Sequence, residues 1–145
     1  FSTTKQTTSQ KMGCLRFCGN MIWILFGGLH MCIAYLIAGV GLCVTIIGIP
    51  FGIQCFKMAL LCLWPFGKEV RSSASGGGCS LIFNILWFVI FGWSIAFFHL
   101  CYMALFYITI IGIPFANQHL KLMSLSISPF GREILDNDND YWQQV

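Results

Sequence analysis

The chain has 145 residues, of which 57% are hydrophobic and only 9% are charged, and its formal net charge is +3. Soluble domains carry about 25% charged residues, so this composition excludes an ordinary soluble protein and predicts an integral membrane protein. The few basic residues form no run that would follow a phosphate backbone, which excludes nucleic acid as a partner.

A polar segment, residues 1–16, opens the chain, and we expect its first ten residues to be disordered. From Phe17 to Ile49 no side chain carries a permanent charge, and a second such stretch runs from Cys79 to Gln118. Each stretch is longer than the ~20 apolar residues that cross a bilayer. The lipid bilayer is therefore the predicted surrounding of most of the chain.

A Gly-Ile-Pro break interrupts the apolar sequence twice, in "TIIGIPFGIQ" and in "TIIGIPFANQ". Proline removes a backbone donor and glycine adds freedom, so each break should kink or unwind its helix. A threonine five residues before each proline is placed to bond back to the opened turn. A packing kink and a functional break both remain open. The predicted helix-break residues are Thr45, Gly48, Pro50, Thr109, Gly112 and Pro114.

The two breaks belong to a tandem repeat, because a shift of 64 positions places the first on the second without a gap. The same shift places "PFGKEV" on "PFGREI". We predict membrane repeats over residues 17–67 and 81–134, a flexible Ser/Gly linker over 68–80 and an acidic tail over 135–145. An N-x-x-W pattern opens each repeat, and its residues are the predicted interfacial anchors: Asn20, Trp23, Asn84 and Trp87.

Each repeat is long enough for two crossings, since about 46 helical residues span about 69 Å and the hydrocarbon core is about 30 Å thick. Lysines and arginines flank both repeats, which predicts cytoplasmic termini. The predicted fold is an all-α integral membrane protein of two tandem helical hairpins, with about four membrane-embedded helices and outer turns near Ala38 and His99. In the alternative, one long helix crosses per repeat and residues 51–66 lie on the membrane surface.

Polar residues follow each break at helical spacing and form a polar face. Its two lysines either extend to the inner headgroups or form a ring in an oligomer that attracts anions. The candidate pore or polar-face residues are Gln54, Lys57, Asn117, Gln118, Lys121, Ser124 and Ser128.

Other polar residues carry weaker signals. His30 and His99 have no acidic partner in their apolar stretches, which favours hydrogen-bonded packing histidines over a proton relay. Most cysteines lie in apolar sequence and behave as small hydrophobes. No metal-ligand spacing, catalytic set or phosphate loop is present, so we predict no enzyme, no cofactor and no metal site.

The doubled "IIGIPFG…K…PFG[KR]" unit with N-x-x-W upstream resembles the YccF family of small inner-membrane proteins, whose domain occurs in two copies. The resemblance covers residues 20–134. It implies a multi-pass protein of the inner or plasma membrane without an enzymatic signature. Ala116 replaces the glycine that follows Pro-Phe, and the helix after it is rich in serine, so the two copies need not do the same job.

Four thin helices cannot enclose a wide path, so a conducting role requires several chains around an axis. The predicted function is a homo-oligomeric channel or pore for small inorganic ions, with a slight preference for anions. The alternative is a non-conducting structural or accessory membrane subunit, with lysines at the headgroups and breaks that serve only the fold.

Overall fold

A computed structural model of the chain describes residues 2–73 and 77–136, with side chains from Gly13 onward. The first repeat consists of α1 (Ser2–Trp23), a π-helical segment (Ile24–Gly28), α2 (Leu29–Cys43), a 3-10 turn (Ile46–Gly48), α3 (Ile49–Leu63) and β1 (Lys68–Ser72). The second repeats this order: α4 (Gly78–Trp87), a π-helical segment (Phe88–Gly92), α5 (Trp93–Ile108), a 3-10 turn (Ile110–Gly112), α6 (Ile113–Ile127) and β2 (Arg132–Asp136). The prediction of two tandem helical hairpins is confirmed.

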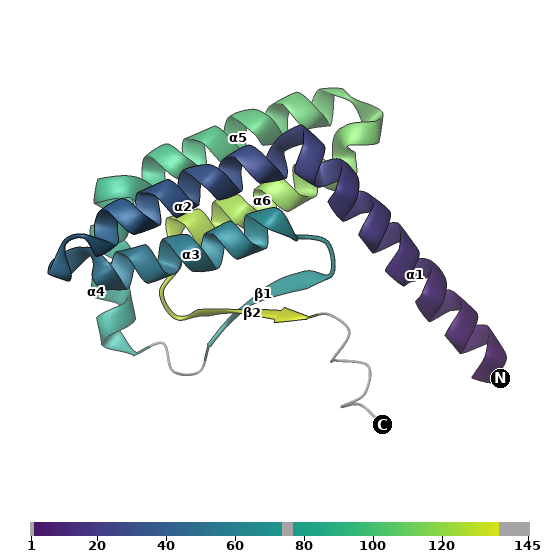
Figure 1. The fold of residues 1–145 in the computed structure, drawn as a ribbon, viewed down its shortest axis with the longest axis horizontal. Coiled ribbons are helices and arrows are strands. Elements are labelled where there is room, and N and C mark those ends of the chain that lie inside the picture. Colours follow the sequence, from purple (N-terminus) through teal and green to yellow (C-terminus); the bar gives the residue numbers. More distant parts are fainter. Residues whose placement is uncertain (1, 74–76, 137–145) are drawn as a thin grey trace.

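The chain's beginning differs from the prediction, because α1 is helical from Ser2 rather than disordered. It continues through the π-helical segment into α2, and α4 continues in the same way into α5. Both long helices change direction at these segments (Figure 1), as π-helical turns often permit. By length and composition, three described helical stretches can cross a membrane: Gly13–Cys43, Ile46–Leu63 and Gly78–Ile108.

The Gly-Ile-Pro break forms the turn of each hairpin. α2 runs to Cys43 and α5 to Ile108, so the predicted outer turns near Ala38 and His99 are wrong. The helices end at the threonine of each break because that residue is extended, with φ −97° at Thr45 and −99° at Thr109. Each proline then stands in the first turn of the returning helix, where its missing N–H leaves no intrahelical bond unmade. The helices are therefore interrupted at their ends rather than kinked within the membrane.

The returning helices pack along their partners, α3 on α2 and α6 on α5. The alternative of a separate surface helix over residues 51–66 therefore does not match the fold, since Phe51, Met58 and Cys62 in this stretch are all buried. Burial of one apolar face against the preceding helix explains this arrangement.

The two repeats are joined by a two-stranded antiparallel sheet, in which Lys68 faces Asp136 and Ser72 faces Arg132. The all-α prediction is therefore incomplete. The stretch predicted as a linker, residues 68–80, contains β1 and the first turn of α4, and β2 takes up Leu135 and Asp136 of the predicted acidic tail. Residues 137–145 lie outside the described part of the chain.

A pseudo-two-fold axis relates the repeats. It passes through the central pair of the sheet, Val70 and Ile134, which are equivalent positions of the two repeats. The hairpins point in opposite directions: the first turn lies at one end of the bundle and the second at the other (Figure 1). Contacts agree with this, because Trp23 at the start of repeat 1 stacks on Phe115 beside the second turn, and Phe51 beside the first turn stacks on Trp87.

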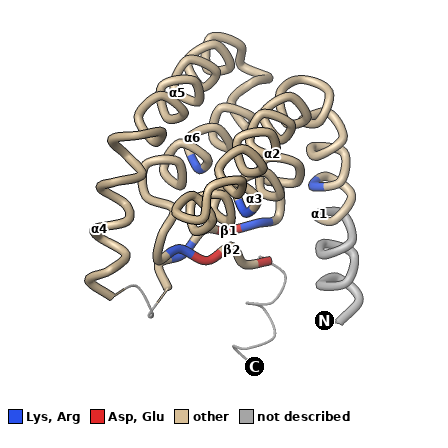
Figure 2. The backbone as a smooth tube through the Cα atoms, turned by 60° about the vertical axis from the view of Figure 1, so that its left-hand side comes forward, with Lys and Arg blue, Asp and Glu red and all other residues tan. Residues whose placement is uncertain are grey.

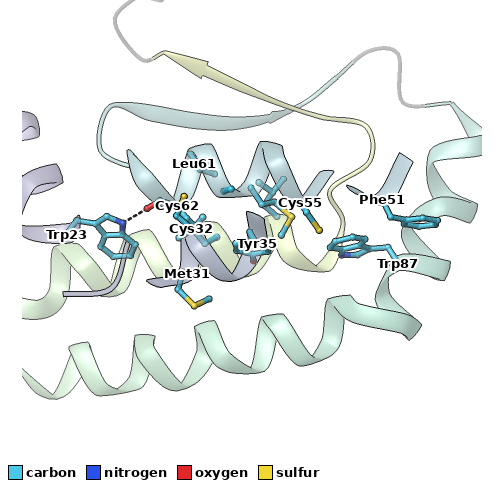
Figure 3. Packing of buried hydrophobic residues seen from close by; sticks show 13 residues of the cluster. Trp23, Met31, Cys32, Tyr35, Phe51, Cys55, Leu61, Cys62 and Trp87 are labelled. Atoms are coloured by element: carbon cyan, nitrogen blue, oxygen red, sulfur yellow. Dashed lines mark hydrogen bonds between the residues drawn. The ribbon is translucent and has the colours of Figure 1, made fainter. Parts of the chain in front are cut away.

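The core lies between the two hairpins. Its buried side chains come from both repeats and include Trp23, Tyr35, Cys55, Cys62 and Trp87 (Figure 3). The strands lie on one side of α3 and α6, and α2 and α5 lie on the other (Figures 1 and 2). The axis thus runs from the sheet through α3 and α6 to the space between α2 and α5.

Candidate functional site

Asparagine and tryptophan of each N-x-x-W pattern fix the end of the hairpin to its beginning. The Asn20 amide donates to the Phe66 carbonyl (3.1 Å) and accepts from the Phe66 N–H (3.0 Å), and Asn84 makes the same pair of bonds with Phe130 at 3.0 and 2.9 Å. The Pro-Phe-Gly turns need their glycines, because φ is 89° at Gly67 and 75° at Gly131.

The tryptophans continue this pattern one helical turn further along. Trp23 Nε1 donates to the Cys62 carbonyl (2.6 Å; dashed line in Figure 3), and Trp87 Nε1 donates to the Ser126 carbonyl (2.7 Å). Asn20, Trp23 and Trp87 are fully buried and Asn84 is half-buried. In the fold these residues close each hairpin by bonding to backbone groups near its end, and their place at the headgroups stays a prediction.

The two lysines of the polar face form crossed contacts between the repeats. Lys57 Nζ donates to the carbonyls of Pro129 (2.7 Å) and Arg132 (3.1 Å) in repeat 2. Lys121 Nζ donates to the carbonyls of Pro65 (2.7 Å) and Lys68 (2.9 Å) in repeat 1. We call these four bonds the lysine latch. Both lysines are half-buried, and each Nζ joins its helix to the loop and strand start of the other repeat.

The remaining polar-face residues lie in several environments. Asn117 is exposed and accepts a bond from the Tyr107 hydroxyl (2.7 Å), and exposed Ser124 accepts one from Arg132 Nη1 (3.4 Å). Gln54 and Gln118 are half-buried, and the side-chain oxygen of each is buried without a partner among the described residues. Ser128 is half-buried at the end of α6. The predicted face is thus divided between the latch, the interior and the outer surface.

A buried polar chain runs between the repeats. Its members are Ser126, Tyr35, His99 and His119, and they are nearly inaccessible to solvent. Tyr35 Oη lies 3.1 Å from Ser126 Oγ and 3.1 Å from His99 Nε2, and His99 Nδ1 lies 3.1 Å from His119 Nδ1. His99 is therefore a hydrogen-bonded histidine of the interior.

The donors and acceptors of this buried polar chain can be assigned in one consistent order. Ser126 donates its only hydrogen to the Leu122 carbonyl (2.8 Å), so Tyr35 must donate to Ser126. Tyr35 then accepts from His99 Nε2–H, and His99 Nδ1 accepts from His119 Nδ1–H. Among the described residues, His119 Nε2 is left as a buried acceptor without a partner. An unsatisfied buried acceptor costs about 1–3 kcal/mol.

The polar chain is asymmetric about the pseudo-two-fold axis, and sequence reasoning missed it. In repeat 1, Cys55 stands at the position of His119 and Cys62 at the position of Ser126. The polar chain therefore extends on the repeat 2 side of the axis. The signal that would have found it is the same shift of 64 positions, which places Tyr35 on His99. His30, by contrast, is exposed and bonds to Tyr102 (2.9 Å).

An apolar cleft of about 730 Å³ lies between α3 and the strands. Leu60 and Trp64 of its wall correspond to Ser124 and Ser128 in repeat 2, so the cleft is another asymmetric feature. The lining residues are Lys57, Leu60, Leu61, Leu63, Trp64, Lys68, Arg132, Glu133, Ile134 and Leu135. In the described part of the chain, no three His, Cys, Asp or Glu side chains gather to hold a metal ion.

Comparison with known proteins accounts for the doubled architecture. The model of the YccF family, described as an inner membrane component domain, matches the chain twice, over residues 18–68 and 82–132. The chain is also 43% identical over 53 residues to Inner membrane protein YccF of Escherichia coli (strain K12) and of Shigella flexneri. This match covers 37% of the chain and only 36% of each relative. No solved structure matches. With both repeats matched by the family model, the chain belongs to the YccF family of membrane proteins.

Proposed function

We propose that this chain is a non-conducting structural or accessory component of the membrane, without catalytic activity. The observation that carries the proposal is the lysine latch. Lys57 and Lys121, on which a selective anion path would depend, each donate two hydrogens to backbone carbonyls of the other repeat.

The latch makes these lysines parts of the fold. An ammonium group within a membrane protein is stabilised when carbonyl oxygens replace its water. Turning either lysine toward a conduit would leave two carbonyls without their donor, one in a Pro-Phe-Gly loop and one at the start of the strand that follows it. It would also loosen the junction between the repeats. The pairing is reciprocal, so both lysines are held in the same way.

Ion flux from vesicles tests the proposal. The purified wild-type chain, shown to be folded and monodisperse, is reconstituted into vesicles loaded with potassium chloride, and chloride and potassium release are measured separately. We expect release equal to that of protein-free vesicles, with an added ionophore as the positive control. Release that depends on the amount of protein contradicts a non-conducting role.

A homo-oligomeric pore with a slight anion preference is the second candidate. The observation that favours it is the exposure of Asn117 and Ser124 on the outer face of α6, where a membrane protein ordinarily presents apolar side chains. In this candidate, the faces of several copies surround a path for small inorganic ions. Conductance should then fall in Asn117→Leu and Ser124→Leu but persist in Leu120→Ala, a change at a neighbouring exposed position.

We further propose that the chain lies in the inner or plasma membrane with the sheet and both termini on the cytoplasmic side. The charged residues support this, since Lys68, Glu69, Arg71, Glu133 and Asp136 all lie on the two strands (Figure 2). Basic residues favour the cytoplasmic side. A protease site inserted after Ser73 should be cut in inverted membrane vesicles and protected in intact cells; cleavage in intact cells contradicts this orientation.

A further inference from the structure

We propose that the tips of both hairpins, residues 44–48 and 108–112, end inside the hydrocarbon core of the bilayer. Each hairpin then lies within the membrane alongside the sheet, which stays at the surface, and neither tip reaches water on the far side. The partner of these surfaces is the acyl chains of the lipids.

Both tips present exposed apolar side chains. Val44, Ile46 and Ile47 are 81–86% exposed, and Ile108, Ile110 and Ile111 are 81–87% exposed. These are among the most exposed large apolar side chains of the described residues, and neither tip carries a charged residue. A turn that emerged into water would present three bare aliphatic side chains to it, whereas the same three side chains are favourable among acyl chains.

The first tip pairs part of its backbone through its own threonine and glycine. The Gly48 N–H donates to the Thr45 carbonyl (2.9 Å), the Thr45 N–H donates to the Leu42 carbonyl (3.1 Å), and the Thr45 hydroxyl donates to the same carbonyl (2.9 Å). The proline two residues later has no N–H to satisfy. An unpaired polar group costs several kcal/mol in hydrocarbon, so each of these internal bonds lowers the cost of placing the turn there.

The second tip repeats this solution. The Gly112 N–H donates to the Thr109 carbonyl (2.9 Å), the Thr109 N–H donates to the Phe106 carbonyl (3.2 Å), and the Thr109 hydroxyl donates to that carbonyl at 3.0 Å. Glycine is needed in both tips, since a Cβ at Gly48 or Gly112 would overlap the carbonyl oxygen of Leu42 or Phe106. The repeated Thr-Ile-Ile-Gly-Ile-Pro sequence thus encodes a turn whose outer surface is apolar and whose threonine is bonded within the turn.

The charged strands limit how the bundle can lie in the bilayer. The tips lie at opposite ends of the bundle, and the strands run beneath α3 and α6 between those ends (Figure 1). If the hairpins crossed the bilayer from tip to tip, the strands would lie at membrane depth, together with Lys68, Glu69, Arg71 and Glu133. Charged residues at that depth are unfavourable. When the pseudo-two-fold axis instead stands along the membrane normal, the sheet lies at the surface and both tips remain in hydrocarbon.

Spin-label accessibility tests this arrangement in the full chain. A nitroxide amino acid is introduced at position 47, 111 or 72 of separate samples, and each protein is placed in nanodiscs of phosphatidylethanolamine and phosphatidylglycerol. Relaxation by dissolved oxygen, which concentrates in hydrocarbon, is compared with relaxation by a water-soluble nickel chelate. We expect oxygen to dominate at positions 47 and 111 and the chelate to dominate at position 72.

Access of the chelate to either tip overturns the proposal. Strong spin–spin broadening between copies at a tip, which disappears on dilution with unlabelled chain, also overturns it, because a second copy would then cover the tip in place of lipid. A measurement on the unaltered chain avoids any effect of the label. Nitroxides at the ends of the acyl chains should broaden the methyl signals of Ile47 and Ile111 more strongly than that of Val70; equal broadening contradicts the proposal.

Discussion

Tyr35 and His99 occupy equivalent positions in the two repeats, and their side chains meet at the pseudo-two-fold axis, with Tyr35 Oη 3.1 Å from His99 Nε2. Two identical residues would meet there in a symmetric dimer. In this single chain the two positions have diverged into a phenol and an imidazole. Because the two residues differ, His99 is the donor and Tyr35 the acceptor of this bond. Ser126 and His119 continue the hydrogen-bonded chain at its two ends.

Removal of the Tyr35 hydroxyl should destabilise the fold. In Tyr35→Phe, the N–H of His99 loses its buried acceptor and Ser126 loses a donor, so we expect the free energy of unfolding to fall by about 1–2 kcal/mol. Tyr107→Phe is the matched control, because its bond to Asn117 is exposed, and its loss should stay below about 0.5 kcal/mol. Unfolding in mixed micelles with increasing SDS measures both; equal losses would mean that the buried chain adds no stability.

The lysine latch predicts a larger effect. Lys57→Met and Lys121→Met keep most of the side-chain stem but remove the ammonium group, so two carbonyls lose a charged donor. We expect each change to reduce the free energy of unfolding by about 2–4 kcal/mol. Lys68→Met is the control, since it removes a partly exposed ion pair with Asp136 and should cost less than about 1 kcal/mol.

Thermal denaturation in detergent distinguishes the three lysine variants. A drop in melting temperature that is no larger for Lys57→Met than for Lys68→Met would contradict the latch. A double variant, Lys57→Met with Lys121→Met, should lose less than the sum of the two single losses if both lysines hold the same junction.

We expect the two tip glycines, Gly48 and Gly112, not to tolerate a larger residue. An alanine Cβ at Gly48 would overlap the Leu42 carbonyl oxygen and the Thr45 hydroxyl, and at Gly112 it would overlap the corresponding atoms of Phe106 and Thr109. Because one obstacle is backbone, we expect Gly48→Ala and Gly112→Ala each to cost more than about 2 kcal/mol.

Gly41→Ala is the control for the tip glycines. It lies in α2 with open space around its Cβ position, and it should be neutral or stabilising by up to about 1 kcal/mol. Yield of folded, monodisperse protein and its melting temperature report all three changes. A Gly48→Ala protein as stable as Gly41→Ala would show that the turn does not need glycine.

The asparagine clamps predict matched losses in the two repeats. Asn20→Ala and Asn84→Ala each remove a donor and an acceptor from a Pro-Phe-Gly loop, and we expect about 2 kcal/mol from each. Asn117→Ala removes an exposed amide and should change the free energy of unfolding by less than about 0.5 kcal/mol. Chemical denaturation followed by tryptophan fluorescence is a direct measurement, since Trp23 and Trp87 lie one turn away. A loss confined to one repeat would contradict the equivalence of the clamps.

The sequence by itself determined the membrane class, the doubled hairpin and the family, because these depend on composition and on a repeat in register over the whole unit. It also located the polar groups that matter, Lys57, Lys121 and His99 among them. The sequence did not identify the partners of these groups. Lys57 binds loop carbonyls 72 and 75 residues away, and those contacts form only when the second repeat folds against the first.

Tertiary structure alone decided where the chain reverses. A Gly-Ile-Pro sequence fits a kink and a turn equally well, since local sequence fixes the missing N–H and the need for glycine but not the direction of the following helix. Packing of α3 on α2 and of α6 on α5 made it a turn. The two strands could not be predicted for the same reason. β1 and β2 are far apart in sequence, and each becomes a strand only through its pairing with the other.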